Sequence, residues 1–370
     1  MQNMVQQGEC SLPFSVAYLD SLQIPQALTD QQVMAVIRFG STTQVPLDDP
    51  RQFTVGLPEL GENNTVEVWY SPHPLQAGGT AGIHYVCNEE VLLAHLLVEE
   101  ADYPDLDTAT YTAYRQIFAF IRRQGYPYLL RMWNYFSDIN SAINSAINSA
   151  INLDSNGLER YQAFCQGRHR ALVEELADFE VLLPAACAIG TVTGGLLIYF
   201  LAAKQPGVQI ENPRQISAFH YPPQYGPKSP SFSRSILKTW GAKQHHLYIS
   251  GTASIVEHAT RHVQNLPAQL QETLTNLEVL LEQASRQVQT PFQLTLLKAY
   301  IRHAVAVTDL RDLIARRFSP AIPILLLQGD ICRRDLLIEI EGIGSSMDEC
   351  SGTARMADSN YLTAAHCTDK

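Results

Sequence analysis

Two glutamates interrupt an apolar run near the end of the 370-residue chain, Glu339 and Glu341 in "DLLIEIEG". Side chains along a β-strand point alternately to opposite faces, so Leu336, Ile338 and Ile340 are expected to share one face and to lie in the core. The two glutamates then share the other face, which lines either solvent or a pocket. In a pocket of low dielectric a carboxyl group keeps its proton to higher pH and can act as an acid. The first chemistry that the sequence suggests is therefore acid catalysis.

The elements around these glutamates alternate in type through the second half of the chain. "HLYISG" predicts a strand, "LTLLKAYIRHAVAV" a second strand, and "TDLRDLIARRF" a helix with Thr308 as its N-cap. "IPILLL" and "DLLIEIEG" predict two closing strands. A helix between the first two strands is predicted from leucines that recur on one helical face, Leu270, Leu274, Leu277 and Leu281. This order predicts a two-layer α+β sandwich with its helices on one sheet face.

The first two hundred residues also predict mixed α+β structure. "LDTATYTAYRQIFAFIRRQG" has an acidic start, an apolar face and a stop at Gly125, which is typical of an amphipathic helix. "YPYLLRMWNYF" predicts the strand that follows. The apolar stretch 181–203 is long enough to cross a membrane. However, "GTVTGG" divides it and Pro184 interrupts its first half, so two buried strands joined by a Gly-rich turn are the better interpretation.

The chain is expected to form two domains and a tail. The boundaries are 1–205 for an N-terminal α+β domain, 206–344 for a second domain, and 345–370 for a disordered tail. The low-complexity repeat "INSAINSAINSAIN" at 139–152 is interpreted as an expanded surface loop. The tail segment "CSGTARMADSNYLTAAHC" resembles the region around the catalytic histidine of trypsin-like proteases. Since no "GDSGG" accompanies it, His366 is not expected to take part in proteolysis.

Composition excludes several classes of partner. The net charge is −11 and no basic stripe is present, which argues against nucleic-acid binding. Seven scattered cysteines without a CxxC pair, and an N-terminus unlike a signal peptide, favour a cytoplasmic protein. "HATRH" places His258 and His262 at a spacing that can bind zinc, but no third ligand stands out. Neither a metal nor another cofactor is predicted, and no membrane contact is expected.

Residues 217–343 resemble the YjgF-like, or reactive-intermediate deaminase, fold. The resemblance is carried by "GPKSPSFSRS", "LYISG", the leucine-rich helix, "YIRHAVAVTDLRDL" and "LLIEIEG". Deaminases of this fold have an arginine on the penultimate strand, and the matching position here is Ile324. The resemblance therefore implies the fold and argues against imine hydrolysis.

Motifs from both halves together resemble the chorismatase family over about residues 10–343. They are "ERYQAFCQGRH", "LPAACAIGT", "ENPRQISAFHYPPQYGPKSPSFSRS", "ISGTASI" and "GDICRRDLLIEIEG". The family removes pyruvate from chorismate without a cofactor. The implied architecture is a YjgF-like C-terminal domain packed on a related N-terminal α+β domain.

The resemblance assigns a role to the glutamates. Cleavage of the vinyl ether of chorismate begins with protonation of its methylene carbon, which requires a carboxyl with a raised pKa. Glu339 matches the family's catalytic glutamate, and Glu341, expected nearer the strand end, is the alternative. The two carboxylates of chorismate call for arginines. The binding residues implied are Arg168, Arg302 and Arg160, the hydroxyls of Tyr161 and Tyr221, and a close backbone approach at Gly251 and Ala253.

Cys332, seven residues before Glu339, bears on the product. In the resemblance, a cysteine at this spacing accompanies members that form 3-hydroxybenzoate, some with 4-hydroxybenzoate, whereas other members form a dihydrodiol. We therefore expect 3-hydroxybenzoate as the main ring product. A dihydrodiol-forming hydrolase, a non-catalytic binding protein and an imine deaminase remain alternatives. Whether the protein is a monomer or a trimer stays open.

Overall fold

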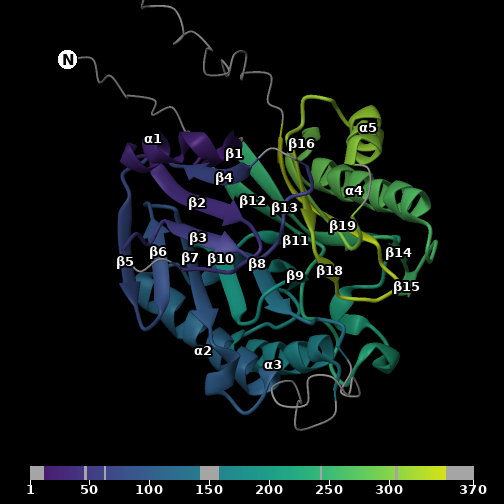
Figure 1. Ribbon diagram of the computed structural model, residues 1–370, viewed down its shortest axis with the longest axis horizontal. Coiled ribbons are helices and arrows are strands. Elements are labelled where there is room, and N and C mark those ends of the chain that lie inside the picture. Colours follow the sequence, from purple (N-terminus) through teal and green to yellow (C-terminus); the bar gives the residue numbers. More distant parts are fainter. Residues whose placement is uncertain are drawn as a thin grey trace, which may run out of the picture.

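A computed structural model describes residues 12–346, apart from 46–47, 62–63, 142–157, 242–243 and 305–306. Three sheets and five α-helices make up this part of the chain, together with a two-stranded ribbon of β14 (Ile255–Val256) and β15 (Ala259–Thr260). Figure 1 shows how these elements are arranged. The predicted α+β class is confirmed. Most of the INSA repeat and the protease-like tail lie outside the described residues.

The six-stranded sheet positions the two glutamates. In spatial order its strands are β11 (Val208–Ile210), β12 (Ser235–Trp240), β13 (Gln244–Ala253), β19 (Ile338–Ser346), β16 (Phe292–Ile301) and β17 (Ile324–Gln328). One face packs against α4 (Leu266–Val288) and α5 (Val307–Arg317) through leucines and isoleucines that include Ile338 and Ile340. The opposite face of β19 carries Glu339 and Glu341, as the alternation predicts. Both are 4% exposed, so this face is buried.

The seven-stranded sheet covers the glutamate-bearing face of the first sheet. Its strands are β18 (Asp330–Ile331), β9 (Ala185–Thr191), β8 (Tyr128–Ser137), β10 (Leu196–Ala203), β7 (Val91–Val98), β6 (Ile83–Cys87) and β5 (Gln76–Thr80). On its outer face lie α2 (Leu106–Gln124), capped by Asp105 and ended by Gly125, and α3 (Arg160–Glu175). The inner face packs on both other sheets.

A four-stranded sheet completes the fold. It consists of β1 (Ser15–Asp20), β4 (Thr65–Tyr70), β2 (Val33–Phe39) and β3 (Gln52–Val55). The short helix α1 (Ile24–Thr29) packs on it. Its inner side contributes Trp69 to the core shared with the seven-stranded sheet.

Several predicted elements are confirmed. The helix over 106–124, the strand after it, and the two strands flanking the Gly-rich turn are all present. None of the helices in the described part of the chain is long and apolar enough to span a membrane.

Three details differ from the prediction. Strand β16 ends at Ile301, so Arg302 follows the strand instead of lying on it. Helix α5 begins at Val307, which places Thr308 inside its first turn. Strand β19 continues to Ser346, so Glu339, not Glu341, lies nearer a strand end. The proposed boundary at 205/206 stays a prediction, and β18 pairs with β9 across it.

Candidate active site

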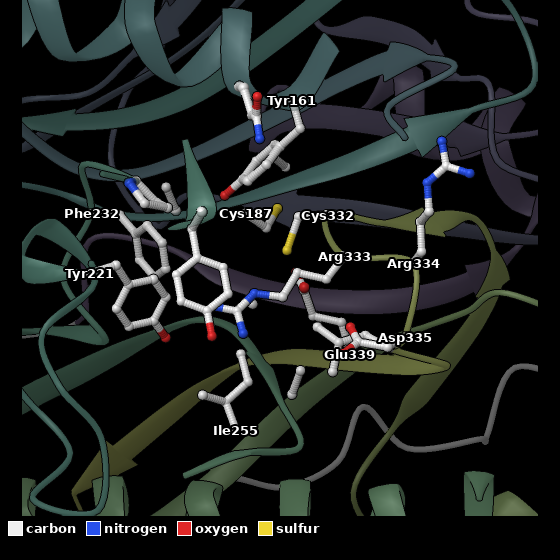
Figure 2. A pocket seen from close by; sticks show the side chains of 18 of the residues that line it. Tyr161, Cys187, Tyr221, Phe232, Ile255, Cys332, Arg333, Arg334, Asp335 and Glu339 are labelled. Carbon is white, nitrogen blue, oxygen red and sulfur yellow. The ribbon is translucent and has the colours of Figure 1, made fainter. Parts of the chain in front are cut away.

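A pocket of about 350 Å³ opens where the six-stranded and seven-stranded sheets meet. Six parts of the chain line it: the part of α3 up to Arg168, strand β9, the loop before β12, the end of β13, the start of β14, and the segment from Cys332 to Glu339. Figure 2 shows side chains from these parts converging on one space. Of the predicted site residues, the pocket lining includes Glu339, Cys332, Arg168, Tyr161, Tyr221, Gly251 and Ala253.

Glu339 is the titratable group with the chemistry expected of an acid. Its side chain is 4% exposed and lines the pocket from the second residue of β19. Burial, together with the negative charge of Glu341, raises its pKa to about 8, against the opposing effect of Arg131, Arg234 and Arg302. A carboxyl with this pKa is largely protonated at neutral pH and can donate a proton to a bound molecule.

Gly251 makes the space that the Glu339 carboxyl occupies. A Cβ at this position would lie 1.9 Å from Oε1 and 2.6 Å from Cδ of Glu339. The residue lies in a β-bulge of β13, where the pairing with β19 shifts between Ile249 and Thr252. The backbone approach to a substrate expected at Gly251 stays a prediction, and the group that lies against this glycine in the structure is the Glu339 side chain.

The neighbouring Ser250 ties three segments together beside the bulge. Its hydroxyl donates to the Ser233 carbonyl at 2.6 Å and accepts from the Ala186 N–H at 2.8 Å. Since Ala186 belongs to β9 and Ser250 to β13, the bond between them links the two sheets at the pocket.

Glu341 shares its strand face with Glu339 but lies away from the pocket. It forms ion pairs with Arg131 of β8 and, at 3.4 Å, with Lys298 of β16, and it accepts from Trp133 Nε1 at 2.7 Å. Burial alone would raise its pKa, but Arg131 and Lys298 outweigh burial and lower it. Glu341 is therefore a buried carboxylate held as an anion, and Glu339 is the one suited to donate a proton.

Four arginines line the pocket, as a substrate with carboxylates requires. Arg168 and Arg234 are 2% and 4% exposed, and among the described residues neither Nε has a hydrogen-bond partner. Arg333 donates to the His258 carbonyl at 2.8 Å, and its guanidinium lies 3.9 Å from the centre of the Tyr225 ring. Arg334 points away from the other labelled side chains in Figure 2 and donates to the backbone of the 138–141 turn.

Aromatic rings and thiols form the rest of the lining. Tyr161 of α3 and the rings of Tyr221 and Phe232 from the loop before β12 face the space in Figure 2, with the sulfurs of Cys187 and Cys332 beside them. The Tyr221 hydroxyl accepts from Arg234 at 2.7 Å. Burial, then the charge of Glu339, raises the pKa of Cys332 to about 12, so this thiol is neutral.

Two of the arginines nominated from the sequence lie outside the pocket lining. Arg160 pairs with Glu100 at 2.8 Å and donates to the Ser137 carbonyl at 3.0 Å. Arg302 bonds to three backbone carbonyls of the 331–336 segment, and also to Asp330 and Asn140. Its guanidinium therefore holds the segment that carries Cys332 and Arg333.

Sequence reasoning missed Arg234, Arg333, Tyr225, Phe232 and Cys187. All five lie in the motifs that carry the family resemblance, in "PPQYGP", "SFSRS", "CRRD" and "AACAIG". The sequence therefore did contain a signal that these stretches belong to the site. What the sequence lacked was a way to tell which side of each segment turns toward the pocket.

The two histidines of "HATRH" form hydrogen bonds with different partners. His258 contacts the Tyr225 hydroxyl at 3.1 Å, and His262 contacts Glu272 at 3.1 Å. Across the described residues, no group of three or more His, Cys, Asp or Glu side chains is arranged to hold a metal ion.

Comparison with known proteins places the chain in a family. Residues 67–202 match the family described as "Chorismatase FkbO/Hyg5-like, N-terminal". A 3-hydroxybenzoate synthase of Streptomyces hygroscopicus is 33% identical over 331 residues, which are 85% of this chain and 92% of the relative. The chain belongs to the chorismatase FkbO/Hyg5 family. A chorismatase of Streptomyces rapamycinicus is 34% identical over 76% of this chain and 83% of its own length.

Solved structures agree with this membership of the chorismatase family. A crystal structure of a chorismatase matches with a TM-score of 0.76 and 32% identity, over 89% of this chain and 98% of that one. The predicted membership and fold are thereby confirmed. Partial similarity to YjgF/RidA proteins is also found: RidA of Psychrobacter sp. covers 30% of this chain and 86% of its own, with a TM-score of 0.23 and 16% identity.

Proposed function

We propose that this protein cleaves the enolpyruvyl ether of chorismate and releases pyruvate and 3-hydroxybenzoate. One observation carries the proposal: Glu339 is a buried carboxyl in an arginine-lined pocket, and its pKa of about 8 keeps it protonated near neutral pH. Chorismate as substrate is further supported by the family, and the product by the name of the 3-hydroxybenzoate synthase relative.

The reaction begins with a proton transfer to carbon. The Glu339 carboxyl gives its proton to the terminal methylene of the vinyl ether, which leaves an oxocarbenium ion and the Glu339 carboxylate. The oxygen of the neighbouring ring hydroxyl, in place of water, then bonds to the ring carbon that carries the ether; the bond from that carbon to the ether oxygen breaks, pyruvate leaves, and the hydroxyl proton passes to the Glu339 carboxylate. Breaking of the original carbon–oxygen bond of that hydroxyl and loss of the proton from the newly bonded carbon then aromatise the ring. Pyruvate and 3-hydroxybenzoate together contain every atom of chorismate, so neither an oxidant nor net water is consumed. No metal or cofactor is needed in this sequence of steps.

The pocket supplies the groups that would hold the substrate. Arg168, Arg234 and Arg333 are the cations we assign to its two carboxylates, since a planar guanidinium can bind a carboxylate through two hydrogen bonds. Arg168 and Arg234 each keep an unpartnered Nε, within the described residues, for such a bond. Tyr161, Tyr221 and Phe232 provide aromatic surface for the ring.

Incubation with chorismate tests the function and the product separately. Pyruvate is followed with lactate dehydrogenase and NADH, and the ring products are separated by chromatography. Pyruvate release with 3-hydroxybenzoate as the main aromatic product is expected. Absence of pyruvate from correctly folded protein would overturn the function. Pyruvate with dihydrodiol alone would overturn the product assignment and leave ether cleavage in place.

A further inference from the structure

Four buried charges form a closed cluster between the sheets, beside the pocket. Glu341 pairs with Arg131 and with Lys298, and Lys298 Nζ lies 2.7 Å from Glu67 Oε2. Each of the four side chains is no more than 4% exposed. Two carboxylates and two cations make the cluster neutral, and the charges of Glu67 and Glu341 outweigh burial and raise the pKa of Lys298, so it stays ionised.

Strand β19 brings the cluster close to Glu339. Glu339 and Glu341 are two residues apart on one strand face, and their partners across the strand pair with β16 are Tyr300 and Lys298. Lys298 is thus directly opposite Glu341, while Glu339 is opposite an uncharged phenol whose hydroxyl contacts Tyr135 at 2.8 Å. Among the described residues no ion pair to Glu339 is found, whereas Glu341 has two.

We propose that this cluster is a positioning element for the acid: Glu341 holds Arg131 and Lys298 away from Glu339, and its own negative charge disfavours an anion two residues along the same face. Glu341 acts through Glu339 and does not touch the substrate. The inference rests on the proposed role of Glu339, and it assigns a function to four residues that the chemistry itself does not use.

Other charged or titratable groups also face Glu339 from the elements around it. Besides Arg131 of the cluster itself, they are Arg234 before β12, Arg302 after β16, Cys187 of β9 and Cys332 of the preceding segment. Arg302 already donates five hydrogen bonds, and Arg234 bonds to Tyr221 and the Ile216 carbonyl. The cluster, in contrast, contains the anion Glu341 and the cation Arg131, which move the pKa of Glu339 in opposite directions. This difference in sign can be tested.

The test follows the ionisation of Glu339 in three variants of the full chain. Glu341→Gln removes the anion and should move the midpoint of the Glu339 titration to lower pH. The expected shift is on the order of one to two pH units, the size expected for unit charges at this spacing in a protein interior. Arg131→Gln should move it to higher pH. The double variant Glu341→Gln/Arg131→Gln, which keeps the cluster neutral, should return close to the wild type.

Two readouts keep this inference separate from the proposed function. The first is the alkaline limb of the pH profile of pyruvate release. The second is the infrared band of a protonated carboxyl, assigned to Glu339 by its loss in Glu339→Gln, which needs no activity. If the pH at which this band is half lost shifts between the variants as expected, and no chorismate is cleaved, then the proposed function fails and the electrostatic coupling stands.

Glu67→Gln is the matched control because it removes a carboxylate from the same cluster at the end away from Glu339. Its shift should be smaller than that of Glu341→Gln, although both variants disturb the packing alike. Equal shifts, or shifts of the same sign in Glu341→Gln and Arg131→Gln, would mean that the cluster acts only on the fold and would overturn the inference. If a single variant fails to fold, the other single variant and the neutral double variant still decide the sign.

Discussion

Glu339 and Glu341 are equally buried on one face of one strand, yet their pKa values move in opposite directions. Burial and Glu341 raise the pKa of Glu339, whereas Arg131 and Lys298 overcome burial and lower the pKa of Glu341. Since both are 4% exposed, the difference comes from their partners and not from their distance to solvent. The comparison shows how a strand can carry an acid and a permanent anion two residues apart.

The largest expected effect separates the two carboxyls by function. Glu339→Gln should lower the rate of pyruvate release by a factor on the order of 10²–10⁴, because an amide cannot protonate carbon. The rate is measured with the lactate dehydrogenase assay on protein whose circular dichroism matches the wild type. Glu278→Gln, an equivalent change in an exposed ion pair with Arg317, is the control and should leave the rate unchanged. A Glu339→Gln rate within a few-fold of the wild type would give the acid role to another group.

The same two carboxyls should give opposite contributions to stability as pH changes. The folded pKa of Glu339 is about 8, above its ordinary value, so the folded state binds a proton that the unfolded state has released. Its contribution is complete at low pH, and the free energy of unfolding should fall between about pH 4.5 and 8, by on the order of 3–5 kcal/mol. Glu341, with a lowered pKa, stabilises above its unfolded pKa and loses this contribution as pH falls through its folded value.

Urea denaturation from pH 5 to pH 8.5 checks this difference. The curve of Glu339→Gln should lack the decline that the wild type shows, and Glu278→Gln should follow the wild type. Parallel curves for Glu339→Gln and the wild type would mean that Glu339 is not protonated in the folded protein.

The strand alternation predicted which residues share the face of Glu339, but it could not predict what covers that face. The partner that lowers the pKa of Glu341 is Arg131, 210 residues earlier in the chain, and nothing local indicates such a contact. The arginines show the same limit. Arg168 was predicted and lines the pocket. Arg302 was also predicted, but its N–H groups donate hydrogen bonds to backbone carbonyls of a neighbouring segment. Periodicity predicts which residues share a face of a strand. Which polar side chains remain free to bind a substrate is decided only by the packing of distant segments.

The third prediction displaces the acid without changing its chemistry. Gly251→Ala would put a Cβ 1.9 Å from Glu339 Oε1, so the carboxyl must move. A displacement of about 1 Å of a catalytic group can cost about 10²-fold in rate, and a loss of this order in pyruvate release is expected. Gly40→Ala, where the nearest atom would be 3.9 Å away, is the control. An unaffected Gly251→Ala enzyme would show that the position of the carboxyl in the bulge does not matter.

The smallest expected effect concerns the ring, after the acid has acted. Cys332 contributes a neutral thiol to the pocket that holds Glu339, because burial and the charge of Glu339 raise its pKa to about 12. A thiol is a weak hydrogen-bond donor and acceptor, so it does not hold a water molecule in place for attack. Cys332→Ala opens room for water beside the ring and should raise the share of dihydrodiol several-fold, while total pyruvate release stays within a few-fold of the wild type. Chromatography of the ring products measures the share, with Cys87→Ala, at a buried thiol outside the pocket lining, as the control. If Cys332→Ala lowers pyruvate release as strongly as Glu339→Gln and leaves the product ratio unchanged, then Cys332 serves proton transfer, and the fate of the ring is decided elsewhere in the pocket.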